Sequence, residues 1–175
     1  MCAQISLPWG GTVVGDAGPY SDDQWSDVWR KLFATDRTLR GVLQGYANEL
    51  EVTTPGALAI QIDTGAALVD GKFYETDAVI PFAIVAPGGG FNYYTVALSK
   101  NWLGGSAQTV RATLLGPNAA AYPIVAQVDG TLWEIPLAHV RISNVGAITI
   151  YDIRAFAVAS FAFPVAGRQG LTDDN

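Results

Sequence analysis

Charged residues are scarce in this chain of 175 residues. They make up 15% of it, while hydrophobic residues make up 50% and the mean hydropathy is +0.23. Yet no run of about 18 apolar residues exists to span a bilayer, because the most apolar stretch, 155–163, ends at Pro164. The opening Met1–Ile5 also lacks the basic and apolar regions of a secretory signal peptide. We therefore expect no membrane insertion, and we expect the apolar surface to be buried against partner chains.

The side chains that carry most enzyme chemistry are nearly absent. The single cysteine, Cys2, excludes an internal disulfide framework and a thiolate-rich metal site. A Ser–His–Asp or Cys–His arrangement would have to use the single histidine, His139, which lies in the strand-like run 135–142. The alternative for His139 is a strand position at a sheet surface or an interface. We therefore predict that the protein is not an enzyme.

No pattern of metal ligands or phosphate-binding residues is present either. The only acidic runs are Asp22-Asp23, which suits a helix N-terminus, and Asp173-Asp174, in a polar tail. Neither matches a calcium loop, although an oxygen-ligand site built from separate loops remains open. The net charge of −6 does not suit binding to phosphate backbones. We predict no cofactor, no metal and no direct nucleic-acid partner.

The first part of the chain is predicted to be an extended arm followed by one helix. Gly and Pro break the first twenty residues, and their apolar side chains must pack on the same domain or on a neighbour. Ser21 and Gln24 form a capping-box pattern that starts a helix over about 22–34. Its apolar face follows helical spacing and consists of Trp25, Val28, Trp29, Leu32 and Phe33. The glycine-containing segment 38–46 is predicted to be a loop.

From residue 49 onward the hydrophobic period changes to two, which is typical of strands. Ten short runs are expected to form strands, at 50–53, 58–63, 66–69, 72–75, 79–84, 93–99, 109–115, 124–128, 132–143 and 147–153. Asp70-Gly71 and Asp129-Gly130 each carry the type I′ hairpin signal, with Gly71 needed for its positive φ. The pattern predicts a mainly β protein, an antiparallel β-sandwich or open barrel with one N-terminal amphipathic helix and extended terminal arms.

The chain is expected to divide into three parts. These are an N-terminal arm and helix over 1–47, a β-sandwich over 48–156 and a C-terminal arm over 157–175. A phenylalanine-rich strip near the end contains Phe156, Phe161 and Phe163. This strip is either a last edge strand or an arm that docks on a partner.

Several strand residues are candidates for contacts between subunits. Asp152 and Arg154 are two residues apart, so on a strand they share a face and can pair together or across a subunit boundary. Arg111 and Glu134 lie among apolar neighbours, where a charge needs a partner. We hypothesise that some of these residues form interface ion pairs. Aromatic residues that could bind a carbohydrate are Trp102, Tyr93, Tyr94, Tyr122 and Trp133, although core or interface positions are the more common role of such residues.

The order of motifs from about residue 41 to 156 resembles a group of small virion structural proteins of tailed bacteriophages. Those motifs are Asn48–Thr53 with Pro55-Gly56, Gly65–Tyr74, Gln108–Leu115, Trp133–Val140 and Ile148–Phe156. In the group, a Gly-x-Ala-x-Val-x-Gly-x-x-Tyr hairpin, a Thr-Val-Arg-Leu strand, a Glu-Ile-Pro-Leu-Ala strand and a closing Asp-x-Arg recur in this order. The strand at 91–98 departs from the group's charged pattern, which leaves placement in the tail or the capsid open.

The resemblance implies a non-enzymatic virion protein of the tail, the baseplate or an attached fibre. It implies a homo-oligomer, with a trimer as the working assumption, and contacts with other virion proteins. The alternatives are a capsid decoration (cement) protein and a carbohydrate-binding adhesin that recognises a host-surface glycan. The predicted interface consists of Trp25, Val28, Trp29, Leu32, Phe33, Asp152, Arg154, Phe161 and Phe163.

Overall fold

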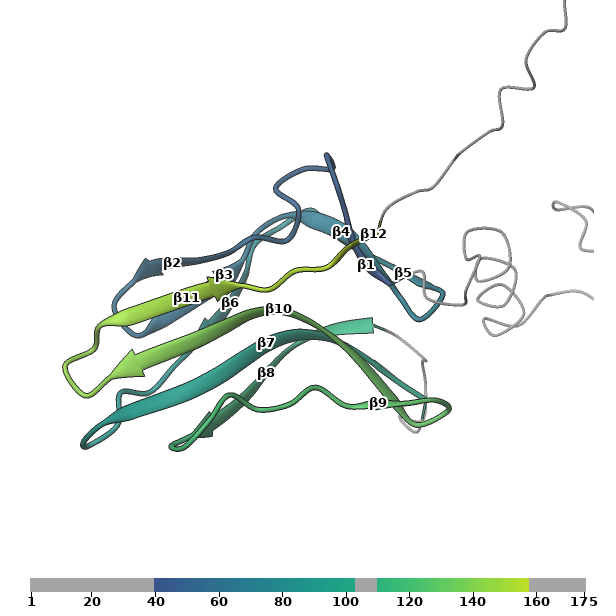
Figure 1. Cartoon of the computed structure of the whole chain (residues 1–175). Coiled ribbons are helices and arrows are strands. Elements are labelled where there is room, and N and C mark those ends of the chain that lie inside the picture. The colour runs from purple at the N-terminus through teal and green to yellow at the C-terminus, as the bar shows by residue number, and fades with distance from the viewer. Residues whose placement is uncertain (1–39, 103–109, 158–175) are drawn as a thin grey trace, which may run out of the picture.

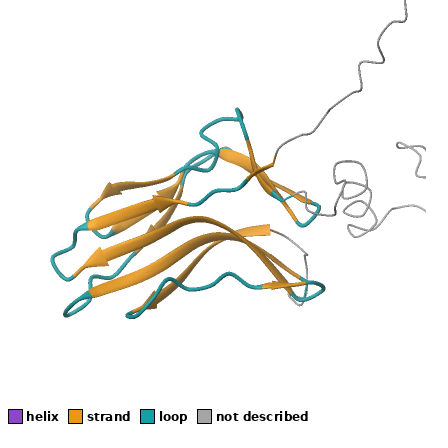
Figure 2. Cartoon of the chain, in the orientation of Figure 1, coloured by secondary structure: helices purple, strands orange, loops and turns teal. Residues whose placement is uncertain are grey.

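The computed structural model describes residues 40–102 and 110–157, and this part of the chain is mainly β (Figures 1 and 2). It contains no helix in those ranges. The strands are β1 (Gly41–Leu43), β2 (Val52–Gly56), β3 (Ala59–Ile62), β4 (Gly65–Val69), β5 (Lys72–Thr76), β6 (Ile80–Ala83), β7 (Phe91–Asn101), β8 (Val110–Asn118), β9 (Gln127–Val128), β10 (Leu132–Ser143), β11 (Ile148–Asp152) and β12 (Phe156–Ala157). The predicted helix at 22–34 lies outside the described residues.

These strands form three sheets and do not close into a barrel (Figure 1). The largest sheet has the order β11-β10-β7-β8, with the short β9 also paired to β10. The second sheet has the order β12-β1-β4-β5, and the third has the order β2-β3-β6. Neighbouring strands are antiparallel except β1 and β12, which run parallel.

One hydrophobic core joins the three sheets. In Figure 1, β10, β7 and β8 form the lower layer, and β2, β3 and β6 lie above it. The buried side chains between the layers include Val42, Val52, Ile60, Ile62, Val69, Tyr94, Val96, Leu98, Val140 and Ile142. On β10 the buried Val140 and Ile142 alternate with His139 and Arg141, which are half-buried. The large sheet therefore has one face in the core and one face outward, as side-chain alternation along a strand requires.

The period-two pattern located the strands well but missed β1. The start of the phenylalanine-rich strip forms the short edge strand β12, which was one of the two alternatives for that strip. Each of the ten predicted runs overlaps a strand, although 124–128 is strand only at its last two residues. β1 lies in a segment that was predicted to be a loop because of its glycines. Gly41 has φ +144, and a Cβ there would lie 2.5 Å from the carbonyl oxygen of Ala155. The glycine permits β1 to pack closely against the chain that leads into β12, which is a long-range contact.

The two Asp-Gly dipeptides both end up in hairpins, but the loops differ in length. Val69 pairs with Lys72, so Asp70 and Gly71 form a two-residue turn with φ of 48° and 76°, as predicted. Val128 instead pairs with Leu132, which leaves a three-residue loop. The second type I′ prediction is therefore wrong in turn length, because the pairing of β9 with β10 sets the register there.

The three-part division remains a prediction. The segments 1–39 and 158–175 lie outside the described residues, so the helix and most of both arms are not tested. Two short strands cross the expected limits, however. β1 precedes residue 48 and pairs with β4, while β12 spans the boundary at 156–157.

Candidate functional site

The outward face of the large sheet carries a group of aromatic side chains. In the strand register, His139 of β10 lies between Tyr151 of β11 and Thr95 of β7. In the next row, Arg141 pairs with Tyr93, and beyond it Ser143 pairs with Phe91. Residues two apart on a strand share a face. These rows therefore place Phe91, Tyr93, His139, Arg141 and Tyr151 together on the face opposite the core.

A loop crosses this outward face and holds one more aromatic residue over it. We call residues 119–126, between β8 and β9, the strap (Figure 1). The hydroxyl of Thr95 donates a hydrogen bond to the carbonyl of Pro123 at 2.7 Å. The backbone N–H of Ala126 donates to Glu134 Oε2 at 2.8 Å. Tyr122 stacks on His139 with ring centroids 4.2 Å apart and planes at 4°. The strap is thus fixed to the sheet at three points.

Tyr122 is the centre of what we call the aromatic cluster: Phe91, Tyr93, Tyr122, His139 and Tyr151. Its ring makes edge contacts with Tyr93 at 5.0 Å and with Tyr151 at 6.3 Å, measured between centroids. Phe91 extends the cluster, with its ring centroid 6.3 Å from that of Tyr93. Phe91 and Tyr151 remain 41% and 44% exposed. The cluster is therefore ordered by mutual packing and still offers ring surface to solvent.

The electrostatic character of this face differs from that of the whole acidic chain. Burial lowers the pKa of His139 below its usual value, which favours the neutral imidazole at pH 7. The guanidinium of Arg141 lies 4.7 Å from the centre of the Phe91 ring. It has no carboxylate partner in the part of the chain that the structure describes. Burial, with the neighbouring Tyr151, raises the pKa of Tyr122, and Arg141 partly opposes this shift.

Glu134 is the only carboxylate on β7, β8 and β10, and it is buried. Its Oε1 accepts a hydrogen bond from the Ser99 hydroxyl at 2.7 Å, and its Oε2 accepts the bond from Ala126. Both oxygens are thus engaged within the chain, so Glu134 serves to hold the strap. Arg111, by contrast, is exposed on β8. The environment of Glu134 therefore does not support the hypothesis that this residue forms an ion pair at an interface.

Only two of the five aromatic residues expected for carbohydrate binding lie on this face. Tyr93 and Tyr122 belong to the aromatic cluster. Tyr94 and Trp133 are in the core, at 2% and 9% exposure, and Trp102 packs against the core with the Lys100 ammonium 4.1 Å from its ring centre. Sequence reasoning missed Phe91 and Tyr151. Their period-two spacing with Tyr93 and Thr149 was the available signal.

Asp152 and Arg154 form an ion pair within the chain, which is one of the two alternatives that their spacing left open, although Arg154 lies just beyond the end of β11. Arg154 Nε lies 2.9 Å from Asp152 Oδ1, and Nη2 lies 2.6 Å from Oδ2. These hydrogen bonds hold the pKa of Asp152 below its usual value. Arg154 Nη1 also donates to the carbonyl of Glu49 at 2.8 Å. The pair therefore fixes the loop before β2, and its role at a subunit boundary remains a prediction.

Beside this pair lies an open groove with a volume of about 220 Å³. Its lining combines apolar side chains with two carboxylates, and consists of Glu51, Val52, Leu137, Ala138, Ile150 and Asp152. Glu51 and Asp152 are both exposed, and Asp152 is engaged by Arg154.

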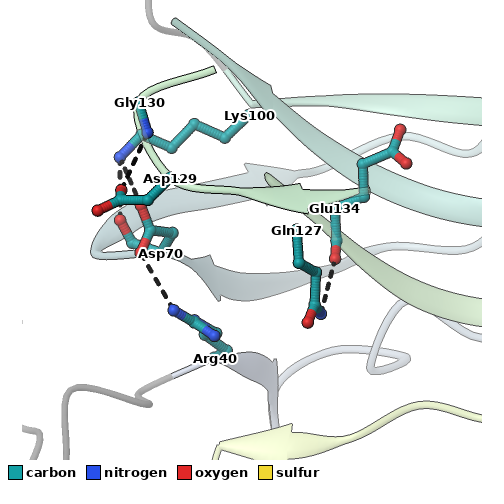
Figure 3. Close-up of polar contacts among 7 residues, drawn as sticks. All are labelled: Arg40, Asp70, Lys100, Gln127, Asp129, Gly130 and Glu134. Carbon is teal, nitrogen blue, oxygen red and sulfur yellow. Dashed lines mark hydrogen bonds and ion pairs between the residues drawn. The ribbon is translucent and has the colours of Figure 1, made fainter. Parts of the chain in front are cut away.

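A second polar cluster is buried where β7, the β4–β5 turn and the start of β1 meet (Figure 3). Lys100 Nζ donates to the carbonyl oxygen of Asp70 at 3.0 Å and to its Oδ2 at 3.2 Å. Arg40 Nη2 lies 3.6 Å from Asp70 Oδ1, and its guanidinium carbon lies 3.4 Å from the centre of the Trp133 ring. The side chain of Lys100 is only 1% exposed, so this cluster has a structural role: it links β7 to the turn between β4 and β5.

Neither a metal site nor a membrane-crossing helix is found in the described ranges. Over residues 40–102 and 110–157, no three His, Cys, Asp or Glu side chains gather where they could hold an ion. In the same ranges no helix has the length and apolar character to cross a bilayer. The predictions of no enzyme activity and no cofactor remain predictions. Of the predicted interface residues, Trp25, Val28, Trp29, Leu32, Phe33, Phe161 and Phe163 lie outside the described residues.

Comparison with known proteins does not add a family to this description. No family model matches the chain, and no curated protein or solved structure is similar enough to count as a match.

Proposed function

We propose that this chain is a non-enzymatic structural protein of a bacteriophage virion, in the tail, the baseplate or an attached fibre. In this proposal a β-sandwich body assembles into a homo-oligomer through its terminal segments. The order of strand motifs supports the virion class. The low charge content supports extensive burial of surface against other chains.

The observation that carries the assembly role is the pairing of β1 with β12. Val42 pairs with Phe156 and Leu43 with Ala157 in a parallel arrangement. The segments 1–39 and 158–175 therefore join the body at neighbouring strands of one sheet (Figure 1). Because the strands are parallel, the two segments join opposite ends of this pair, which is only two to three residues long. Both segments therefore attach within about 10 Å of each other and can engage the same neighbouring subunit. Burial of a few hundred Å² of such surface contributes several kcal/mol at about 25 cal/mol per Å².

Removal of either terminal segment is expected to dissociate the oligomer without unfolding the body. The variants are a chain that starts at Arg40 and a chain that ends at Ala157, both of which keep β1 and β12. Light scattering coupled to size-exclusion chromatography should give an oligomer for the full chain and a smaller species for each deletion. Circular dichroism should show unchanged β content. A full chain that stays monomeric at high concentration would overturn the assembly role.

The same arms would suit a capsid decoration protein that clamps neighbouring capsid subunits. Electron microscopy of the particle separates this alternative from a tail location, because it gives position and symmetry together. The third candidate, an adhesin that binds a host-surface glycan, is favoured by a different observation. This is the partly exposed aromatic cluster on the large sheet, whereas the strands next to both terminal segments, β1 and β12, belong to another sheet.

A further inference from the structure

We propose that the aromatic cluster and Arg141 form a binding site for an acidic glycan, a saccharide that carries a carboxylate. This inference deepens the adhesin candidate and rests on that part of the proposed function. It does not depend on assembly through the terminal segments. The ligand class follows from three features of the outward face of the large sheet.

The first feature is a set of ring surfaces held in fixed positions. Tyr122 is fixed by its stack on His139 and by edge contacts with Tyr93 and Tyr151. Because the strap is also hydrogen-bonded to Thr95 and Glu134, little conformational entropy is lost when a ligand contacts these rings. The exposed rings of Phe91 and Tyr151 present apolar surface. The C–H face of a pyranose ring is apolar as well, so it can pack on such rings while its hydroxyl groups remain in water.

The second feature is a cation beside these rings with no carboxylate to neutralise it. The guanidinium of Arg141 lies over Phe91 and has no ion-pair partner in residues 40–102 and 110–157. A planar guanidinium binds a carboxylate through two parallel hydrogen bonds, and this geometry is stronger than that of neutral partners. A ligand that carries a carboxylate could pack on the aromatic rings and bind the Arg141 guanidinium at the same time.

The third feature is the distribution of charge. The chain as a whole has a net charge of −6, which repels polyanions. The strands β11, β10, β7 and β8, however, carry only two carboxylates: Glu134, which is buried, and Asp152, which is paired with Arg154, whereas Arg141 and Arg111 lie on the outward face. An acidic ligand would therefore approach the protein on this face. One arginine beside the rings, Arg141, is too few for the phosphate contacts of a nucleic acid, but it suffices for a saccharide that carries a carboxylate.

Binding of defined saccharides to the full-length protein tests this site. The acidic probes are a galacturonate hexamer, a hyaluronan hexamer and sialyllactose. Maltohexaose serves as the uncharged counterpart, and a hexaglutamate peptide supplies charge without sugar. Calorimetry should detect binding of at least one acidic saccharide, with weaker or no binding of maltohexaose and hexaglutamate.

The variants separate the site from the rest of the surface. Arg141→Gln and Tyr151→Ala should each weaken binding of the acidic saccharide by about tenfold or more, the loss expected for one charge-assisted hydrogen bond or one stacking contact. Tyr151→Phe keeps the ring and should bind nearly as the original does. Matched controls are Arg111→Gln, on the same face, and Phe73→Ala, an exposed ring on β5. Both controls should leave the affinity within about twofold.

Each other result overturns the proposal. Failure of all three acidic saccharides to bind removes the site. Equal binding of hexaglutamate shows a generic anionic or protein partner instead, and equal binding of maltohexaose removes the role of Arg141. If the protein is an oligomer but binds no glycan, the glycan-binding site is wrong and the assembly role still stands. If the protein is a monomer that binds the acidic saccharide, the assembly role is wrong and the glycan-binding site still stands.

Discussion

Asp70 combines a local role with a long-range one. Its backbone adopts φ 48° in the turn between β4 and β5, a conformation that Asp and Asn tolerate better than most residues. Its carboxylate accepts a hydrogen bond from Lys100, thirty residues away in the sequence, and lies near Arg40 (Figure 3). A buried charge needs partners, and Lys100 and Arg40 supply them for this carboxylate, which is 5% exposed.

Asp70→Asn is expected to destabilise the protein by about 2–4 kcal/mol, because the buried Lys100 ammonium loses its carboxylate. Asn retains the turn conformation, so the change isolates the charge. Urea unfolding gives the free energy of unfolding. Asp129→Asn is the matched control: Asp129 is an exposed turn residue in the other Asp-Gly hairpin, and its replacement should change stability by under about 0.5 kcal/mol. Similar small losses for both variants would contradict the role of the buried cluster.

At the scale of elements, the strap depends on one buried side chain. Glu134 accepts hydrogen bonds with both carboxylate oxygens, from Ser99 on β7 and from Ala126 in the strap. The strap in turn keeps Tyr122 over His139. The organisation of the aromatic cluster therefore depends on a carboxylate that contributes no exposed surface itself.

Glu134→Gln should loosen the strap. A glutamine side chain can still accept from the Ala126 N–H, and the Ser99 hydroxyl can rotate to accept from its NH₂ group. The bond to Ala126 is no longer charge-assisted, however, at a cost of about 1 kcal/mol. Hydrogen exchange at the Ala126 amide should become faster than in the original protein. Gln127→Ala is the control, because the exposed Gln127 makes only a 3.4 Å hydrogen bond to the Glu134 carbonyl (Figure 3). Unchanged exchange at Ala126 in Glu134→Gln would show that the strap is held by other contacts.

The strands themselves show what local pattern can predict. Runs such as 132–143 and 72–75 were located almost to their ends, because alternation and turn residues act over a few positions. β1 was missed, and β12 was only one of two alternatives for the phenylalanine-rich strip, because neither strand has a pattern of its own. Three and two residues long, they form strands only by pairing with each other, and β1 also pairs with β4.

At the scale of the whole molecule, the three sheets share one core and should unfold together. Ile62 on β3 is fully buried in the same cluster as Val140 of β10. The smallest sheet, β2-β3-β6, buries its apolar side chains only against the other two. Its stability is therefore tied to theirs.

Ile62→Ala is expected to cost about 2–5 kcal/mol, since it removes buried methyl groups and leaves a cavity. Thermal unfolding should remain a single transition, and amide exchange should accelerate in β10 as well as in β3. Gln61→Ala, one residue away and pointing to the other face of the strand, should have a much smaller effect. A separate early transition of β2, β3 and β6 would contradict a shared core.

The sequence by itself determined the mainly β class, most strand positions and the Asp70-Gly71 turn. These features depend on residues close together in the chain. Tertiary structure decided which side of each strand faces inward. Tyr93 and Tyr94 are neighbours that must point to opposite faces, and only the packing of the sheets sends Tyr94 into the core and Tyr93 to the aromatic cluster. The strap, the tie between Lys100 and Asp70 and the parallel strands β1 and β12 likewise join distant residues. Their formation depends on packing energy across the whole molecule, which no local pattern contains.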